Sequence, residues 1–257
     1  MYSEINFRIR SLEDIIKDLE VGKDQHGKDV ESIFFGDGNT ILMKTKDLLK
    51  LLDYCKELFP KLKRVTMYGS AQYINLKSLD ELIKLNKAGL SRIHCGMESG
   101  DNNVLKLINK GFTRREMSKA GNLIKEANIE LSLYYIVGLG GTDLSENHAI
   151  NSATLINEIN PDFIRLRTLM PFKNTPLYKL YIENNFKILN AHEALKETKL
   201  FVKTLDNINS HFLSDHISNY CNVGGKLPED KEEIIKQLDY ALSLDCSSFR
   251  SPTLGIL

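Results

Sequence analysis

Strand-like and helix-like segments alternate through most of this chain, and this order limits the possible folds more than any other feature. Five apolar runs rich in β-forming residues are separated by longer segments whose apolar residues recur at helical spacing. Such alternation, at about 30 residues for each unit, predicts a parallel sheet with helices over its outer face. An open doubly wound sheet and a barrel both have this order, so the periodicity leaves that choice open. The expected strands are residues 30–35, 64–68, 92–95, 131–137 and 163–169.

Glycine or other unusual residues follow four of the five expected strands. The carboxyl ends of parallel strands meet at one edge of a sheet or barrel, where ligands bind. Glycine there lets the backbone approach a ligand or adopt a positive φ, although it also serves tight turns that bind nothing. Several such clusters on one rim favour a ligand site over turns alone. The clusters are Gly36-Asp37-Gly38, Gly96 with Glu98 and Ser99, Gly138-Leu139-Gly140-Gly141, and Met170-Pro171.

In their order along the chain and in their residues, these clusters resemble the motifs of the radical S-adenosylmethionine (radical SAM) superfamily. Residues 36–39 (GDGN) resemble the segment after the second barrel strand that meets the methionine amino group of SAM. Residues 96–101 (GMESGD) resemble the fourth-strand segment, in which an acidic side chain approaches the ribose or the methionine. Residues 136–141 (IVGLGG) and 169–171 (LMP) resemble the fifth- and sixth-strand segments along the adenine. Residues 111–114 (GFTR) resemble a motif of the branch that contains Elp3 and HemN.

This resemblance implies a fold, a cofactor and a set of contacts. The fold is an α/β, TIM-like (β/α)6 partial barrel over residues 1–207, with residues 208–257 as a C-terminal helical extension packed on it. The implied cofactors are SAM and a [4Fe–4S] cluster. An electron donor such as flavodoxin or ferredoxin reduces the cluster, so that SAM is cleaved to a 5′-deoxyadenosyl radical. The implied SAM-binding residues are Gly36, Asp37, Gly38, Glu98, Ser99, Gly138, Leu139, Gly140, Arg165 and Met170.

The charged residues of this set have alternative roles. Glu98 can accept charge-assisted hydrogen bonds from the ribose hydroxyls or the ammonium group of SAM, or it is a solvated carboxylate near a helix start. Arg165 and Arg167 lie two apart on one expected strand, so their side chains face the same way. They pair with a SAM or substrate carboxylate, or with Glu98. The tyrosines expected in the core or the pocket wall are Tyr68, Tyr134 and Tyr135.

The cysteines do not fit the implied cluster. In the superfamily a CxxxCxxC loop after the first strand binds it, because an iron–sulfur cluster needs converging thiolates. Here the cysteines are Cys55, Cys95, Cys221 and Cys246, with no CxxC or CxxxC spacing. We therefore expect an N-terminally truncated chain that lacks the first strand and the cluster loop, is inactive alone and self-associates through its bare sheet edge. A natural cluster-less derivative that binds SAM or serves as a scaffold is the alternative.

Composition narrows the remaining function classes. Lys and Arg number 34 and Asp and Glu number 34, a balance that disfavours a nucleic-acid binder. No apolar run reaches the ~20 residues that cross a bilayer, and the N-terminus lacks the apolar core of a secretory signal. A cytoplasmic protein without membrane contact is therefore expected. An ordinary (β/α)-barrel lyase or isomerase is a second alternative, but only Asp37 and Glu98 supply carboxylates at strand ends. No motif identifies the substrate.

Overall fold

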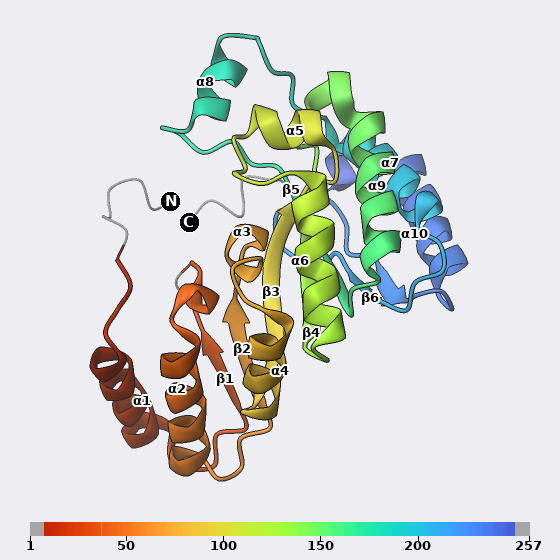
Figure 1. Cartoon of the computed structure of the whole chain (residues 1–257). Helices are drawn as coiled ribbons and strands as arrows, with labels where there is room; N and C mark the ends of the chain where they lie inside the picture. The colour runs from red at the N-terminus through yellow and green to blue at the C-terminus, as the bar shows by residue number, and fades with distance from the viewer. Residues whose placement is uncertain (1–7, 37, 250–257) are drawn as a thin grey trace.

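One sheet forms the centre of the molecule, with its strands side by side in sequence order (Figure 1). The structure is a computed structural model that describes residues 8–36 and 38–249, so the expectations for Asp37 and for the segment that starts at Met1 lie outside the described residues. Strands β1 to β6 run parallel, and β7 runs antiparallel to β6. The strands are β1 (Ser32–Phe35), β2 (Arg64–Tyr68), β3 (Leu90–Glu98), β4 (Glu130–Val137), β5 (Phe163–Thr168), β6 (His211–Leu213) and β7 (Gly224–Lys226).

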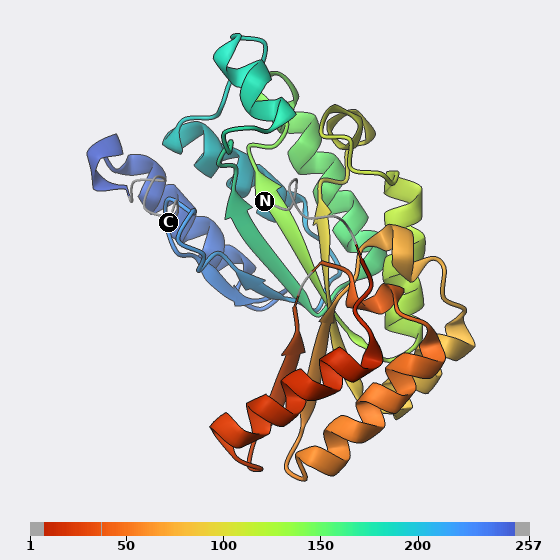
Figure 2. The same cartoon turned by 90° about the vertical axis from the view of Figure 1, so that its left-hand side faces the viewer.

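Helices cover the outer, convex face of this sheet, whereas no described helix covers the inner face of the central strands (Figure 2). The helices are α1 (Leu12–His26), α2 (Thr45–Leu58), α3 (Ala71–Ile74), α4 (Leu79–Lys87), α5 (Asn102–Leu107), α6 (Arg114–Glu126), α7 (Gly141–Ile159), α8 (Pro176–Ile182), α9 (Ala191–Thr204) and α10 (Lys231–Ser243). Short 3-10 turns are η1 (Thr40–Leu42) and η2 (Cys246–Ser248). None of the helices in the described part of the chain is long and apolar enough to cross a membrane.

Alternation along the strands separates the core from the inner face. On β3 and β4 the outward side chains Ile93, Cys95 and Leu133 are fully buried under the helices. The intervening side chains, such as His94 and Tyr134, are half-buried and point to the inner face. Because neighbouring side chains of a strand point to opposite faces, the sheet has an apolar outer side and a more polar inner side.

Side-chain caps determine where several covering helices begin. The hydroxyl of Ser78 accepts from the backbone N–H of Glu81, whose carboxylate accepts in return from the N–H of Ser78. The same reciprocal arrangement starts α6 at Thr113 and α9 at Asn190. Such capping boxes satisfy the free donors of the first helical turn. They set the register of α4, α6 and α9 against the sheet.

The expected α/β partial barrel is confirmed, because strands β1 to β5 coincide with the five apolar runs and the sheet stays open. The structure differs from the expectation in two places. Strand β3 extends to Glu98, beyond the expected end at residue 95, so the acidic motif lies on the strand itself. Residues 208–257 do not form helix alone: β6 pairs with β5, and β7 follows it before α10. Strands of three residues are too short for a periodic signal. The division at residue 207 and the self-association through the edge of β1 stay predictions.

Candidate functional site

The carboxyl ends of β2 to β5 surround one cavity of about 330 Å³ on the inner side of the sheet. Its walls come from every one of these strands and from the loops that follow β1 and α5. Of the residues expected to bind SAM, Gly38 and Glu98 line it. The others in the wall are Asn39, Tyr68, Gly69, Ser70, His94, Gly96, Lys110, Tyr134, Ile136 and Arg167. The clusters after the first and third expected strands therefore contribute to a common hollow, whereas Gly138-Leu139-Gly140-Gly141 and Met170-Pro171 do not line it.

Glu98 is held over this cavity by an irregular strand end. The pairing of β3 with β4 shifts between Gly96 and Glu98, and Glu98 has a φ of 62°. A Cβ atom on Gly96 would lie 2.1 Å from Glu98 Oε1, so glycine leaves the space in which the carboxylate lies. Lys110 Nζ donates to the same oxygen at 3.1 Å, and both side chains are about 20% exposed, at 21% and 19%. Lys110 bonds to only one of the two carboxylate oxygens, and Glu98 lines the cavity.

Ser99, the next residue, faces away from the cavity and is fully buried. His148 Nε2–H on α7 donates to the carbonyl oxygen of Ile136 at 3.0 Å, so its Nδ1 accepts from the hydroxyl of Ser99 at 2.8 Å. Burial lowers the pKa of His148, which keeps the ring neutral and fits this tautomer. The backbone N–H of Asp101 donates to the Ser99 oxygen at 3.0 Å. Ser99 thus fixes the loop after β3 from behind.

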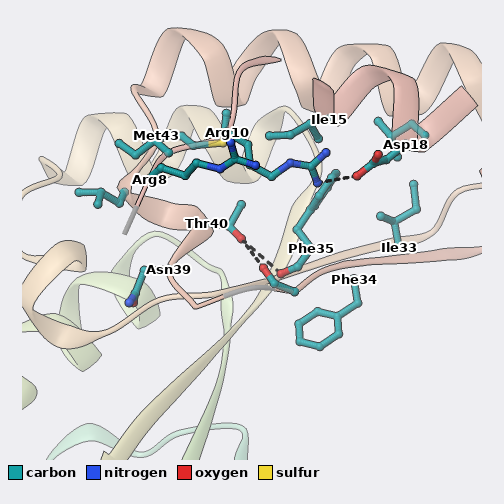
Figure 3. A pocket seen from close by; sticks show the side chains of 14 residues that line it. Arg8, Arg10, Ile15, Asp18, Ile33, Phe34, Phe35, Asn39, Thr40 and Met43 are labelled. Atoms are coloured by element: carbon teal, nitrogen blue, oxygen red, sulfur yellow. Dashed lines mark hydrogen bonds and ion pairs between the residues drawn. The ribbon is translucent and has the colours of Figure 1, made fainter. Parts of the chain in front are cut away.

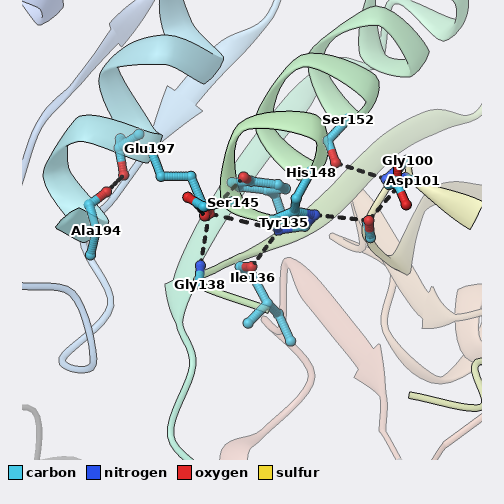
Figure 4. A network of polar contacts seen from close by, with 12 residues as sticks. Gly100, Asp101, Tyr135, Ile136, Gly138, Ser145, His148, Ser152, Ala194 and Glu197 are labelled. Atoms are coloured by element: carbon cyan, nitrogen blue, oxygen red, sulfur yellow. Dashed lines mark hydrogen bonds and ion pairs between the residues drawn. The ribbon is translucent and has the colours of Figure 1, made fainter. Parts of the chain in front are cut away.

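Glu197 on α9 anchors the glycine-rich end of β4 (Figure 4). It is 3% exposed, and one carboxylate oxygen accepts from the N–H of Gly138 at 2.7 Å and the hydroxyl of Tyr135 at 2.9 Å. The other oxygen accepts from the hydroxyl of Ser145 at 2.5 Å. Burial, followed by the adjacent carboxylate, raises the pKa of Tyr135 well above its ordinary value, so the phenol keeps its proton. The loop of Gly138 is therefore held by a buried acid.

Sequence reasoning missed Glu197. Its neighbours on the inward face of α9 are Ala194, Thr198 and Phe201, all of them buried. An acidic residue on an otherwise apolar helical face is seldom buried without partners. That departure from the amphipathic pattern was the available signal, because it indicates donors in the facing layer.

The remaining expected residues in the described part of the chain do not line this cavity. Gly36 lines a second hollow of about 310 Å³ between α1 and β1, where the hydroxyl of Thr40 donates to its carbonyl oxygen at 3.1 Å and to that of Phe35 at 3.3 Å (Figure 3). Leu139 is 3% exposed and packs in the core, and Gly140 is the N-cap of α7. Met170, just beyond β5, is half-buried. Arg165 lies within β5, two residues before Arg167 on the same strand.

The three expected wall tyrosines separate onto two sides of the sheet. Tyr68 and Tyr134 line the cavity. Tyr135 is buried behind it, and its ring stacks on Phe201 with centroids 4.3 Å apart. His94 lies between these two tyrosines, and its Nδ1 is hydrogen-bonded to the hydroxyl of Tyr134 at 2.9 Å. Burial, helped by nearby arginines, lowers the pKa of His94 to about 4, so this ring is neutral near pH 7.

Residues 2–152 match the Radical SAM superfamily. The chain belongs to this superfamily. It is 26% identical over 249 residues to the heme chaperone HemW of Buchnera aphidicola from Schizaphis graminum, covering 88% of this chain and 63% of HemW. It is 30% identical over 156 residues to the biotin synthase of a Hydrogenobaculum species, covering 61% of this chain and 43% of that enzyme. The chain therefore spans less than two thirds of these relatives.

Solved structures of the superfamily share the fold. The Elp3 protein of Methanocaldococcus infernus superposes with a TM-score of 0.59 at 18% identity, covering 90% of this chain and 58% of that one. The coproporphyrinogen III oxidase HemN of Escherichia coli superposes with a TM-score of 0.51 at 12% identity, covering 93% and 64%. These two structures show that the chain has the same TIM-like fold. The family match and the similarity to HemW agree with the expected branch of Elp3 and HemN.

The superfamily implies SAM and a [4Fe–4S] cluster, and the residues of this chain fit only the first. Cys55 and Cys95 are buried, and burial raises the pKa of each thiol to about 12, so neither is a thiolate. Among the described residues no group of His, Cys, Asp and Glu side chains could hold a metal ion. The cavity does suit a sulfonium nucleoside, because the Glu98 carboxylate complements its cationic group.

Proposed function

We propose that this chain is the SAM-binding core of a radical SAM enzyme and that SAM lies across the cavity at the ends of β2 to β5. The observation that carries the proposal is the joint position of Gly38 and Glu98 in one hollow at the strand ends. Glu98 accepts from the ribose hydroxyls or the ammonium group of SAM through the oxygen that faces the cavity. Gly36 contributes the backbone after β1 and Met170 the backbone after β5, and Asp37 belongs to the proposed set because of its sequence motif.

The residues behind the rim act as supports in this proposal. Ser99 and the Gly138-Leu139-Gly140 segment are held by His148 and Glu197 in the positions from which their backbone meets the adenine side of SAM. Their side chains do not need to touch the cofactor. Arg165 and Arg167 complete the inner wall on β5.

We further propose that these 257 residues bind SAM without cleaving it. The cysteine spacing offers no cluster site, so a cluster that serves this cavity takes its thiolates from outside these residues. The other partners are a substrate and, for a complete enzyme in the cytoplasm, an electron donor such as flavodoxin or ferredoxin. Neither nucleic acid nor a membrane has a place in the proposal.

Calorimetric titration with SAM, combined with iron and sulfide analysis, tests both statements. We expect saturable SAM binding by a protein without iron. Glu98→Gln should weaken SAM binding about tenfold or more, because a hydrogen bond to a charged group contributes about 1.5–3 kcal/mol. Glu232→Gln, an exposed change in the first turn of α10, is the matched control and should leave the affinity unchanged.

Two results would contradict the proposal. Absence of SAM binding by the folded chain would favour an ordinary barrel lyase or isomerase. A stoichiometric iron–sulfur cluster bound by the chain alone would contradict the second statement.

A further inference from the structure

The side chains on the inner face of the sheet lie in rows from Arg92 up to the cavity wall. We call the region that they surround the lumen, and its upper part is the cavity itself. Residues that are in register on neighbouring parallel strands point to the same face of the sheet. They therefore form rows of side chains that run across the strands. The lowest row is closed by Arg92, whose guanidinium lies 4.0 Å from the centroid of Phe163 and pairs with Glu130 at 2.7 Å. Tyr68, His94 and Ser132 form the next row. Tyr134 and Arg165 form the row above it, and Arg167 lies higher still, at the cavity wall.

Two positive charges of this lumen have no negative partner. Arg92 and Lys110 each form an ion pair with a carboxylate. No carboxylate in the described ranges lies within ion-pair distance of Arg165 or Arg167. Arg167 instead lies over the ring of Tyr134, 5.0 Å from its centroid. His94 adds no charge at neutral pH, because the ring is neutral. The lumen therefore has an excess of two guanidinium groups.

Unsatisfied polar atoms gather in the same place. Arg165 Nε, Ser132 Oγ and Ser70 Oγ are buried and have no hydrogen-bond partner within the described residues. Ser132 is in register with His94 and is fully buried, and Ser70 lines the cavity above. Buried polar groups in folded proteins are almost always hydrogen-bonded. Three such atoms around one lumen indicate a polar ligand that reaches below the rim.

We propose that the lumen binds the carboxylate end of the substrate at Arg165 and Arg167, with the rings of Tyr68 and Tyr134 against its organic part. The edge of a guanidinium that carries Nε–H matches the two oxygens of a carboxylate, and Ser132 Oγ–H, one row deeper than Arg165, is a further donor. The proposal rests on the proposed function, because SAM lies in the same cavity, on the side of Gly38 and Glu98. It gives the substrate class as a carboxylic acid with an unsaturated or aromatic body.

A pair of probes that differ in charge tests this site. Benzoate carries the proposed group on an aromatic body, and benzamide has nearly the same shape without the charge. Each is titrated into the full chain at pH 7, in the absence and presence of SAM, while the ring signal of 13C-labelled His94 is followed by NMR. We expect saturable benzoate binding that moves the His94 signal, and benzamide binding at least tenfold weaker.

Arginine variants identify the binding groups. Arg165→Gln and Arg167→Gln should each weaken benzoate binding about tenfold, while Arg115→Gln, an exposed change on α6, should have no effect. Retained SAM affinity in Arg165→Gln, measured by calorimetry, shows that the variant is folded and supports a substrate site.

Equal binding of benzamide, or equal benzoate affinity in the variants, overturns the proposal. So does a loss of SAM affinity that matches the loss of benzoate affinity, because the arginines then bind the carboxylate of SAM. Absence of SAM binding by the unmodified chain contradicts the proposed function instead.

Discussion

Removing the carboxylate of Glu197 should loosen the end of β4 more than any other single change at the rim. Its two oxygens accept from three donors that are the backbone of Gly138 and the hydroxyls of Tyr135 and Ser145. The residue is 3% exposed, so water cannot replace the lost acceptor without rearrangement. Glu197→Ala therefore leaves three buried donors unsatisfied and opens a gap beside Tyr135.

The expected loss of stability follows from those three donors. A buried donor left without an acceptor costs about 1–3 kcal/mol. Because the contributions of neighbouring groups do not add fully, we expect Glu197→Ala to lower the free energy of unfolding by about 3–6 kcal/mol. Glu197→Gln retains one oxygen at the position that serves Gly138 and Tyr135, and the hydroxyl of Ser145 can turn to accept from the new amide. Its effect should be about 1 kcal/mol.

Urea unfolding followed by circular dichroism measures both values, with Lys196→Ala on the exposed side of α9 as the matched control. The double variant Glu197→Ala with Ser145→Ala should be less destabilised than the sum of the single variants, because the second change removes one of the stranded donors. Equal stability of Glu197→Ala and Lys196→Ala would refute the assignment of Glu197 as the anchor of this loop.

Three further predictions concern the cavity and the thiols. Gly96→Ala places a Cβ in the space of the Glu98 carboxylate, so SAM affinity measured by calorimetry should fall several-fold while stability changes little; unchanged affinity would contradict the role of Glu98. The pKa of His94 is lowered from 6.5 to about 4, so the unfolded chain binds this proton first as the pH falls. Stability in urea should therefore decrease between about pH 6.5 and pH 4, and a His94→Gln variant whose pH profile stays equally steep would contradict this. Cys246 is exposed whereas Cys95 is buried with a pKa raised to about 12, so a thiol reagent at pH 8 should modify only the former before unfolding, as read by mass spectrometry of peptides.

The fold could be predicted from the sequence where the hydrophobic pattern is long. The run at residues 131–137 is nearly continuously apolar, and β4 occupies residues 130–137 with helices on its outer side. β6 could not be found in this way, because three residues contain no period and His211 at its start is exposed. Its position comes from pairing with β5, which is a tertiary contact and has no local signature.

The site could be predicted only to the level of strand ends. The motif around residues 96–101 correctly located a rim segment, yet it could not separate Glu98, which faces the cavity, from Ser99, which is buried against His148. That distinction depends on the bulge between Gly96 and Glu98, and a bulge changes which face a side chain points to. Glu197 lies about 60 residues from the loop it holds, so no spacing rule connects them.

The outer and inner faces of the sheet therefore have different functions at each strand end. The role of a residue there depends on the face to which its side chain points. Outward residues such as Ser99 and Tyr135 bond to α7 and α9, so their substitution should change stability first and SAM affinity second. Inward residues such as Glu98 and Arg165 contact the cavity or the lumen, where several buried polar atoms have no hydrogen-bond partner in the part of the chain that the structure describes. Their substitution should change ligand affinity at nearly constant stability. A variant of Arg165 that lost stability as strongly as Glu197→Ala would place that side chain among the supports and remove it from the binding surface.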